Sequence, residues 1–129
     1  MNKTILVTAA VLGIISIILG AFAAHGLKKV LTPDAINTFE TGVKYQMYHA
    51  VFLLFVGSST YVLDSYKNTV FYLVLVGLVF FSGSIYGLAT NTLTSFDFKK
   101  IGFVTPIGGL LLIISWIVLL INFVKIKVN

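Results

Sequence analysis

The sequence predicts an all-α integral membrane protein, a bundle of four transmembrane helices that forms one membrane domain over residues 1–129. Composition is the first reason: 58% of the residues are hydrophobic, 10% are charged, and the mean hydropathy is +1.03, far above that of a soluble domain. The second reason is pattern. A hydrocarbon core about 30 Å thick needs about 20 apolar residues of helix, and the chain has four such runs separated by short polar breaks.

The four spans are placed at about residues 5–24, 45–63, 69–90 and 103–124. The first run carries no charge and stops at a glycine followed by two lysines, as membrane helices do. Its apolar stretch is longer than the core of a cleaved signal peptide, so we expect it to be retained. An even number of spans places both termini on one side of the membrane.

The segment of residues 33–44 precedes the second span and has a mixed pattern. Thr32 suits an N-cap, Pro33 the first helical position, and Asp34 the positive end of the helix dipole. Apolar residues then recur at helical spacing, which predicts a short amphipathic helix at the interface between spans one and two. An extended, solvated start to span two is the alternative.

The distribution of charges indicates membrane lipids as partners. It does not indicate a nucleic-acid partner. The net charge is +5, but the lysines flank the hydrophobic runs and resemble anchors for anionic head groups. The doubled lysines Lys28–Lys29 and Lys99–Lys100 lie in loops opposite the termini, so the positive-inside rule favours termini outside.

Small residues mark faces on which helices could approach closely. Ser16, Gly20 and Ala24 are spaced four apart in span one, and Gly83 and Gly87 form a similar pair in span three. Such stripes allow backbone contact in lipid, either inside the bundle or between copies of a homo-oligomer.

Alternating spans bring most of the unusual polar residues to one membrane face. An ionisable group inside a span is costly without partners or water, so His49 is the foremost candidate, with Tyr45 and Gln46 on the same helical stripe. The candidate ligand-binding residues are His25, Tyr45, Gln46, Tyr48, His49, Ser82, Ser84, Tyr86, Thr105 and Pro106.

Two functional hypotheses stay open for this polar cluster. It could bind or conduct a small polar molecule, a proton or a lipid head group, with His49 as the pH-sensitive member. Alternatively, the protein is structural or an assembly factor, and the cluster only specifies helix packing, with the tyrosines as an aromatic belt. A water-accessible cavity around His49 would favour the first hypothesis, and a dry, fully paired cluster the second.

Patterns for catalysis and metal binding are missing from the sequence. There is no cysteine, the two histidines lack metal-ligand spacing, and no carboxylate lies within a span. Nucleophile motifs, phosphate-binding loops and paired acids are also missing. We therefore expect neither an enzyme nor a metal or cofactor site.

Four motifs follow one another along the chain: LGAFAAHGL from Leu19, YQMYHA from Tyr45, FSGSIYGLA from Phe81 and TPIGG from Thr105. With them the chain resembles the small membrane proteins of the YgdD/YwdK type, an uncharacterised family defined as a domain of unknown function. The resemblance covers essentially the whole chain and implies a four-helix protein of the bacterial plasma (inner) membrane, without a mechanism. The motifs contain all the candidate ligand-binding residues. The chain departs from the family pattern at Ala23, usually glycine, and at Lys44, often arginine.

Overall fold

The structure, a computed structural model, describes residues 2–127 and is helical apart from short connections. These residues contain five α-helices and no strand, which confirms the all-α class. The helices are α1 Lys3–Ala24, α2 Pro33–Ser58, α3 Asp64–Leu78, α4 Ser84–Ala89 and α5 Val104–Lys125. A π-helical segment, Val79–Gly83, joins α3 to α4, and short 3₁₀ helices lie at Leu27–Lys29, Asn91–Leu93 and Phe98–Ile101.

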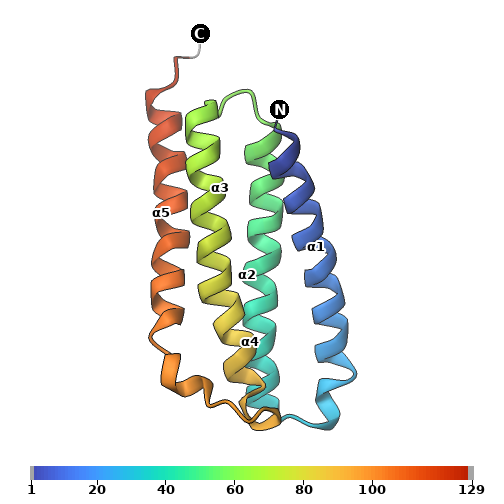
Figure 1. Cartoon of the computed structure of the whole chain (residues 1–129). Coiled ribbons are helices and arrows are strands. Elements are labelled where there is room, and N and C mark those ends of the chain that lie inside the picture. The colour runs from blue at the N-terminus through green and yellow to red at the C-terminus, as the bar shows by residue number, and fades with distance from the viewer. Residues whose placement is uncertain (1, 128–129) are drawn as a thin grey trace.

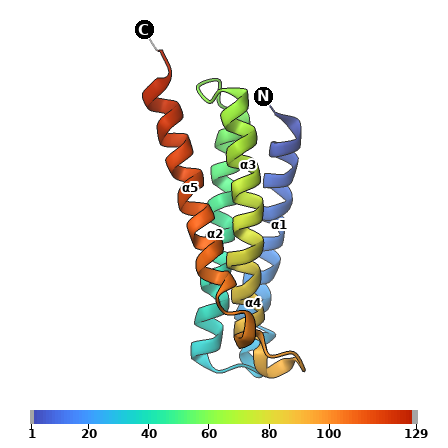
Figure 2. The same ribbon diagram turned by 60° about the vertical axis from the view of Figure 1, so that its left-hand side comes forward.

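The helices form an upright bundle of four rods, because α3, the π-helical segment and α4 are continuous (Figure 1). α1 packs on α2, α3 packs on α5, and the contact between α2 and the α3–α4 rod joins the two pairs (Figure 2). α1 and α5 lie at opposite edges of the bundle in Figure 1. α1 begins and α5 ends at the same end of the molecule.

The expected amphipathic helix over residues 33–44 is part of a longer helix. Thr32 caps α2 as predicted, with its hydroxyl oxygen accepting from the Ala35 N–H at 3.2 Å. The alternative of an extended start is wrong, because α2 continues through residues 44 and 45 without a break. The helix itself ends at Ser58, before the predicted residue 63: Ser58 donates to the Leu54 carbonyl at 2.6 Å, and Ser59 turns to an extended backbone.

The third rod starts at Asp64, earlier than the predicted residue 69. Charged residues suggested a loop there, but Asp64 lies in the first helical turn, where the helix dipole favours a carboxylate. Lys67 is 2% exposed, and its ammonium donates to the Gly57 carbonyl at 3.2 Å. A cation that satisfies the carbonyl end of α2 is therefore compatible with burial in the bundle.

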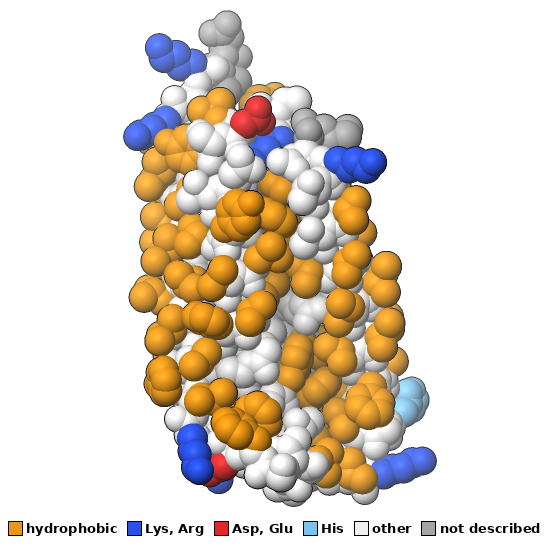
Figure 3. All heavy atoms as spheres, in the orientation of Figure 1, with side chains coloured by type: hydrophobic (Ala, Val, Ile, Leu, Met, Phe, Trp, Pro, Cys, Tyr) orange, Lys and Arg blue, Asp and Glu red, His pale blue; other side chains and the backbone are white. Residues whose placement is uncertain are grey.

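Three helical stretches are long and apolar enough to cross a membrane, namely Lys3–Lys29, Asp64–Ala89 and Val104–Lys125. α2 is equally long, but its charged and polar residues keep it below this level of apolarity. On the face seen in Figure 3, hydrophobic side chains cover the middle of the molecule, and the lysines and carboxylates gather at its two ends. The fold is therefore that of a helical membrane protein with three apolar candidate spans and a fourth long helix.

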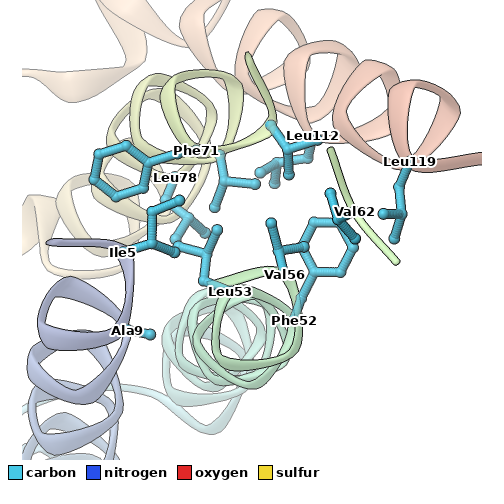
Figure 4. Packing of buried hydrophobic residues seen from close by; sticks show 12 residues of the cluster. Ile5, Ala9, Phe52, Leu53, Val56, Val62, Phe71, Leu78, Leu112 and Leu119 are labelled. Atoms are coloured by element: carbon cyan, nitrogen blue, oxygen red, sulfur yellow. The ribbon is translucent and has the colours of Figure 1, made fainter. Parts of the chain in front are cut away.

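The hydrophobic core lies where all four rods meet. α1 contributes Ile5 and Ala9, and the other rods add residues such as Leu53, Phe71 and Leu112 (Figure 4). A smaller cluster of Ala23, Leu27, Phe39 and Ala89 closes the opposite end. Two packed clusters thus fix α1 against α2 over their whole length.

Gly108 of α5 lies directly against the backbone of the third rod. A Cβ atom added there would lie 2.7 Å from the Phe80 carbonyl carbon and 2.8 Å from the Gly77 oxygen. Only glycine permits this contact between α5 and the third rod, since the obstacle is backbone that no side chain can move aside.

The small-residue positions predicted from spacing differ in their surroundings. Ser16 is buried, Ala24 is half-buried, and Gly20 makes an ordinary contact with Val43. Gly87 faces the Phe98 ring of a connection, and Gly83 is exposed, with no atom within 4 Å of an added Cβ. Gly83 therefore does not pack helices within the chain, because the π-helical segment turns it outward.

We predict that Gly108→Ala lowers the free energy of unfolding by about 1–3 kcal/mol, because the added methyl group overpacks a backbone contact. Thermal unfolding in detergent, followed by circular dichroism, would measure the change. Gly83→Ala is the matched control and should not lower the transition, because nothing lies within 4 Å of the added Cβ and alanine favours the helix. Superimposable curves for Gly108→Ala and the wild type would contradict the close crossing.

Candidate functional site

Gln46 is the centre of a buried polar network. Its side chain is 5% exposed, its Nε2 donates to the Leu12 carbonyl of α1 at 3.0 Å, and its Oε1 accepts from the Tyr86 hydroxyl of α4 at 2.7 Å. Ser16 donates to the same Leu12 carbonyl at 2.8 Å. One amide thus connects α1, α2 and α4 through both of its ends.

Two serines extend this network to the other rods. Ser82 donates to the Gly42 carbonyl of α2 at 2.8 Å. Ser84 shares a hydrogen bond of 2.5 Å with Thr105 of α5 and also reaches the Phe80 carbonyl. Both serines lie at the π-helical segment, whose widened turn disturbs the regular backbone ladder and gives side-chain hydroxyls carbonyls to bind.

His49 is buried, and both of its ring nitrogens are engaged. Nδ1 lies 2.7 Å from the Tyr45 carbonyl, and the Trp116 indole N–H donates to Nε2 at 3.2 Å. Because an indole nitrogen only donates, Nε2 must accept, and the proton lies on Nδ1. The partners therefore assign the neutral imidazole, held between α2 and α5.

Four of the predicted site residues lie outside the network. His25 is exposed at the C-terminal end of α1, and Pro106 is exposed in the first turn of α5. Tyr45 and Tyr48 are 41% and 56% exposed, and neither phenol has a hydrogen-bond partner within residues 2–127. The structure thus pairs Gln46 with Tyr86 and Ser84 with Thr105, and it bonds Ser82 and His49 to other residues of neighbouring rods, in separate hydrogen bonds and not in one open pocket.

A groove between α2 and α5 is the opening next to His49. It has a volume of about 310 Å³ and opens to the side of the bundle, and its lining consists of Tyr45, His49, Phe81, Gly109, Leu112, Ile113 and Trp116. An adjoining hollow of about 440 Å³ shares Tyr45, His49 and Trp116 and adds Met47, Tyr48 and Val51. We call these two joined hollows the α2–α5 groove.

The groove is aromatic and almost entirely apolar. The Trp116 ring stacks on Phe52, with centroids 4.1 Å apart, which holds the indole at the groove wall. Tyr45 meets Phe81 edge-on, with centroids 5.1 Å apart. The shape and lining suit an apolar molecule that enters sideways from the bilayer.

The polar network leaves nothing buried and unpaired. Across residues 2–127, every buried side-chain nitrogen and oxygen has a hydrogen-bond partner. The same residues contain no group of three histidine, cysteine or carboxylate side chains that could hold a metal ion. The network is therefore fully paired, whereas the groove is open.

Two important residues were not selected from the sequence. Trp116 is the only tryptophan of the chain, and this uniqueness was an available signal. Asn122 is fully buried in α5, accepts from the Leu63 N–H at 3.0 Å and donates to the Tyr61 carbonyl at 2.8 Å. An asparagine inside the apolar run LLINFV could have indicated this link to the α2–α3 connection.

Comparisons with known proteins agree with a membrane protein. A family model described as a protein of unknown function (DUF423) matches residues 19–109. The chain is 37% identical to the UPF0382 membrane protein SSP2132 of Staphylococcus saprophyticus, over 96% of this chain and 99% of that protein. It is 34% identical to YwdK of Bacillus subtilis (95% and 98%) and 33% identical to the inner membrane protein YgdD of Escherichia coli (98% and 93%). No solved structure matches the chain.

We predict that Gln46→Leu destabilises the fold by about 1–3 kcal/mol, because the Tyr86 hydroxyl loses its buried partner. Tyr86→Phe should cost less, and a double-mutant cycle of the two changes should give a coupling energy of about 0.5 kcal/mol or more. Thermal unfolding in lipid nanodiscs supplies the values. The exposed Thr38→Val on α2 is the control. Strictly additive losses would show that this hydrogen bond does not connect the two rods.

Proposed function

Because the chain belongs to the DUF423 family, and full-length relatives of it are named membrane proteins, we propose that it spans the membrane four times and binds an amphiphilic molecule of the bilayer. The resemblance to the YgdD/YwdK type is confirmed by the matches to YwdK and YgdD themselves. That the protein resides in a membrane follows directly from this kinship. The four spans and the ligand are our proposals.

The argument for a fourth span rests on the pairing of α1 with α2. At one end the Asn2 N–H donates to the Gly57 carbonyl at 2.9 Å, and at the other Ala23 packs with Phe39. If α1 crosses the bilayer, α2 crosses beside it. Its polar residues Gln46 and His49 are buried, so α2 does not present them to lipid.

We propose the bacterial plasma (inner) membrane as the location, with both termini outside. Lys28, Lys29, Lys99 and Lys100 are exposed at the end of the bundle opposite the termini. At the terminal end, Lys67 is buried against Gly57 and is not available to a lipid surface. The exposed lysines are thus biased towards the loop end, as the positive-inside rule requires of a cytoplasmic face.

One observation carries the binding function: the α2–α5 groove opens sideways beside His49 and has an apolar, aromatic lining. A route for polar solutes would instead need unpaired polar atoms along a wet path. Every buried polar side-chain atom of the network has a hydrogen-bond partner. For the network, though not for the groove, this favours the second hypothesis, that the polar residues specify helix packing. In this proposal the network is the scaffold, the groove is the site, and no catalytic step is involved.

The topology is tested by cysteine labelling, since the chain contains no cysteine of its own. Lys125→Cys should react with an impermeant maleimide added to intact cells. Lys99→Cys should react only after the membrane is opened. Labelling of both variants from the same side would rule out the four-span arrangement, and the reverse pattern would invert the orientation.

The binding function is tested through Trp116, the single tryptophan, which lies in the groove. Titration of the purified protein with a phosphatidylcholine carrying dibrominated acyl chains should quench its fluorescence saturably, with about one site per chain. Gly109→Leu should fill the groove and weaken this quenching.

A reporter outside the groove is the control for the titration. Moving the tryptophan to α3, as Trp116→Phe with Tyr72→Trp, places it on a helix face that is 64% exposed at Tyr72. This reporter should be quenched only in proportion to the brominated lipid. The same proportional quenching of Trp116 would mean that the groove is ordinary lipid-facing surface.

A further inference from the structure

The connection between α4 and α5 has a shape fixed by its own hydrogen bonds. The Asn91 side chain folds it back on itself: Nδ2 donates to the Asp97 carboxylate at 3.2 Å, and Oδ1 accepts from the Phe98 N–H at 2.8 Å. Asp97 also caps the 3₁₀ helix Phe98–Ile101 by accepting from the Lys99 N–H at 3.1 Å. The side chains of this connection are therefore presented from a defined backbone.

The 3₁₀ helix of the connection lies beside the last turn of an apolar candidate span. A Cβ atom added at Gly87 would lie 2.6 Å from the Phe98 ring, and Gly87 lies just before the end of the apolar stretch Asp64–Ala89. In Figure 1, α5 begins farther from the loop end of the bundle than α2 does, so the connection runs along the side of α4. In the proposed topology this level is the boundary between the hydrocarbon core and the head groups.

Large apolar side chains are exposed along the connection. Leu93, Phe96 and Phe103 are 49%, 50% and 65% exposed, and Phe96 meets the Phe98 ring edge-on with centroids 4.9 Å apart. Apolar area left in water costs free energy in proportion to its size. Aromatic side chains are enriched at the level where head groups meet acyl chains. A lipid surface therefore suits these side chains better than water does.

Two lysines of the same connection add positive charge to this surface. Lys99 and Lys100 are exposed, and Asp97 is the only acidic residue between α4 and α5. Its Oδ1 already accepts from two N–H groups of the connection, which compensates part of its charge. Lysine stems can lie along acyl chains while their ammonium groups reach phosphate oxygens. A free phosphate would use the lysines but leave the phenyl rings in water, whereas a phospholipid accommodates both.

We propose that the connection of residues 91–103 is a docking surface for anionic phospholipids, with the ammonium groups of Lys99 and Lys100 on the phosphate and with Phe96 and Phe103 in the adjoining acyl region. This surface shares no residue with the lining of the α2–α5 groove. It rests on the proposed crossing of the third rod and α5, and it does not depend on any ligand of the groove.

The experiment uses the full chain in nanodiscs and a tryptophan in the connection, Phe103→Trp combined with Trp116→Phe. Brominated phosphatidylglycerol and brominated phosphatidylcholine are compared at equal mole fraction. Both should quench the fluorescence, and bromines near the head group should quench more than bromines near the chain end. Phosphatidylglycerol should quench at least about twofold more strongly, because each lysine near the surface attracts anionic lipid. Lys99→Gln with Lys100→Gln should make the two lipids equal.

Controls separate this surface from the rest of the protein. A tryptophan at position 14 of α1, where Ile14 is 58% exposed, should be quenched equally by the two lipids. Lys125→Gln with Lys127→Gln, at the other end of the bundle, should leave the preference at position 103 unchanged. Lys99 and Lys100 are exposed, so their glutamine variants should keep the wild-type melting curve.

A second measurement leaves Trp116 in place. Native mass spectrometry of the otherwise wild-type chain, released from mixed-lipid nanodiscs, should detect fewer retained phosphatidylglycerol molecules after the change of Lys99 and Lys100 to glutamine. The change of Lys125 and Lys127 should have the smaller effect. Equal retention in the two double variants would overturn the proposal.

Three fluorescence results would also overturn it. A tryptophan at position 103 that neither lipid quenches would place the connection in water. Equal quenching by the two lipids with both lysines present, or a preference that persists without them, would exclude the phosphate contact. The same preference at position 14 would mean general enrichment of anionic lipid around the protein. None of these results depends on the titration of Trp116, so the proposed function of the groove stands or fails separately.

Discussion

A buried amide that must satisfy both of its ends inside the bundle is the constraint on which this fold depends. Gln46 is 5% exposed, so each end of its amide needs a protein partner. The structure supplies Leu12 from α1 and Tyr86 from α4, and these two helices are held at a fixed distance as a result. Lipid gives no hydrophobic drive for one helix to prefer another, so such directional bonds and close backbone contacts must define the register.

The π-helical segment of Val79–Gly83 allows the third rod to make both a close backbone contact with α5 and a hydrogen bond with α2. It lies between Gly77, which faces Gly108 of α5, and Tyr86, which faces Gln46 of α2. The widened turn changes the angular relation between residues before and after it. One rod can thereby place a glycine against α5 and a tyrosine against α2. The groove beside Phe81 lies at the same level, because α5 is drawn towards the third rod there rather than towards α2.

The sequence was sufficient for the helices and for the inward polar residues, because both depend on local pattern. Composition indicated the membrane, Thr32 and Pro33 marked the start of α2, and the cost of an ionisable group in lipid identified His49, with Gln46 on the same helical stripe. Which residues of different helices contact one another could not be derived in this way. Whether His49 meets Trp116, or Gly108 meets Gly77, depends on the rotation of rods about their axes, and spacing within one helix does not fix that rotation. Gly83 shows the same limit, since the π-helical segment that turns it outward has no sequence signature.

The pairing of α1 with α2 has a consequence for how the protein is made. α2 is the least apolar of the long helices, and entering lipid by itself would expose Gln46 and His49 to the hydrocarbon. α1 is synthesised first, and its Leu12 carbonyl can receive the Gln46 amide as soon as α2 emerges. In the proposed topology, α2 therefore leaves the insertion machinery as the second arm of a helical hairpin. In this first hairpin the Oε1 atom of Gln46 still lacks a hydrogen-bond partner. It gains one, the Tyr86 hydroxyl, when the third rod packs against the hairpin.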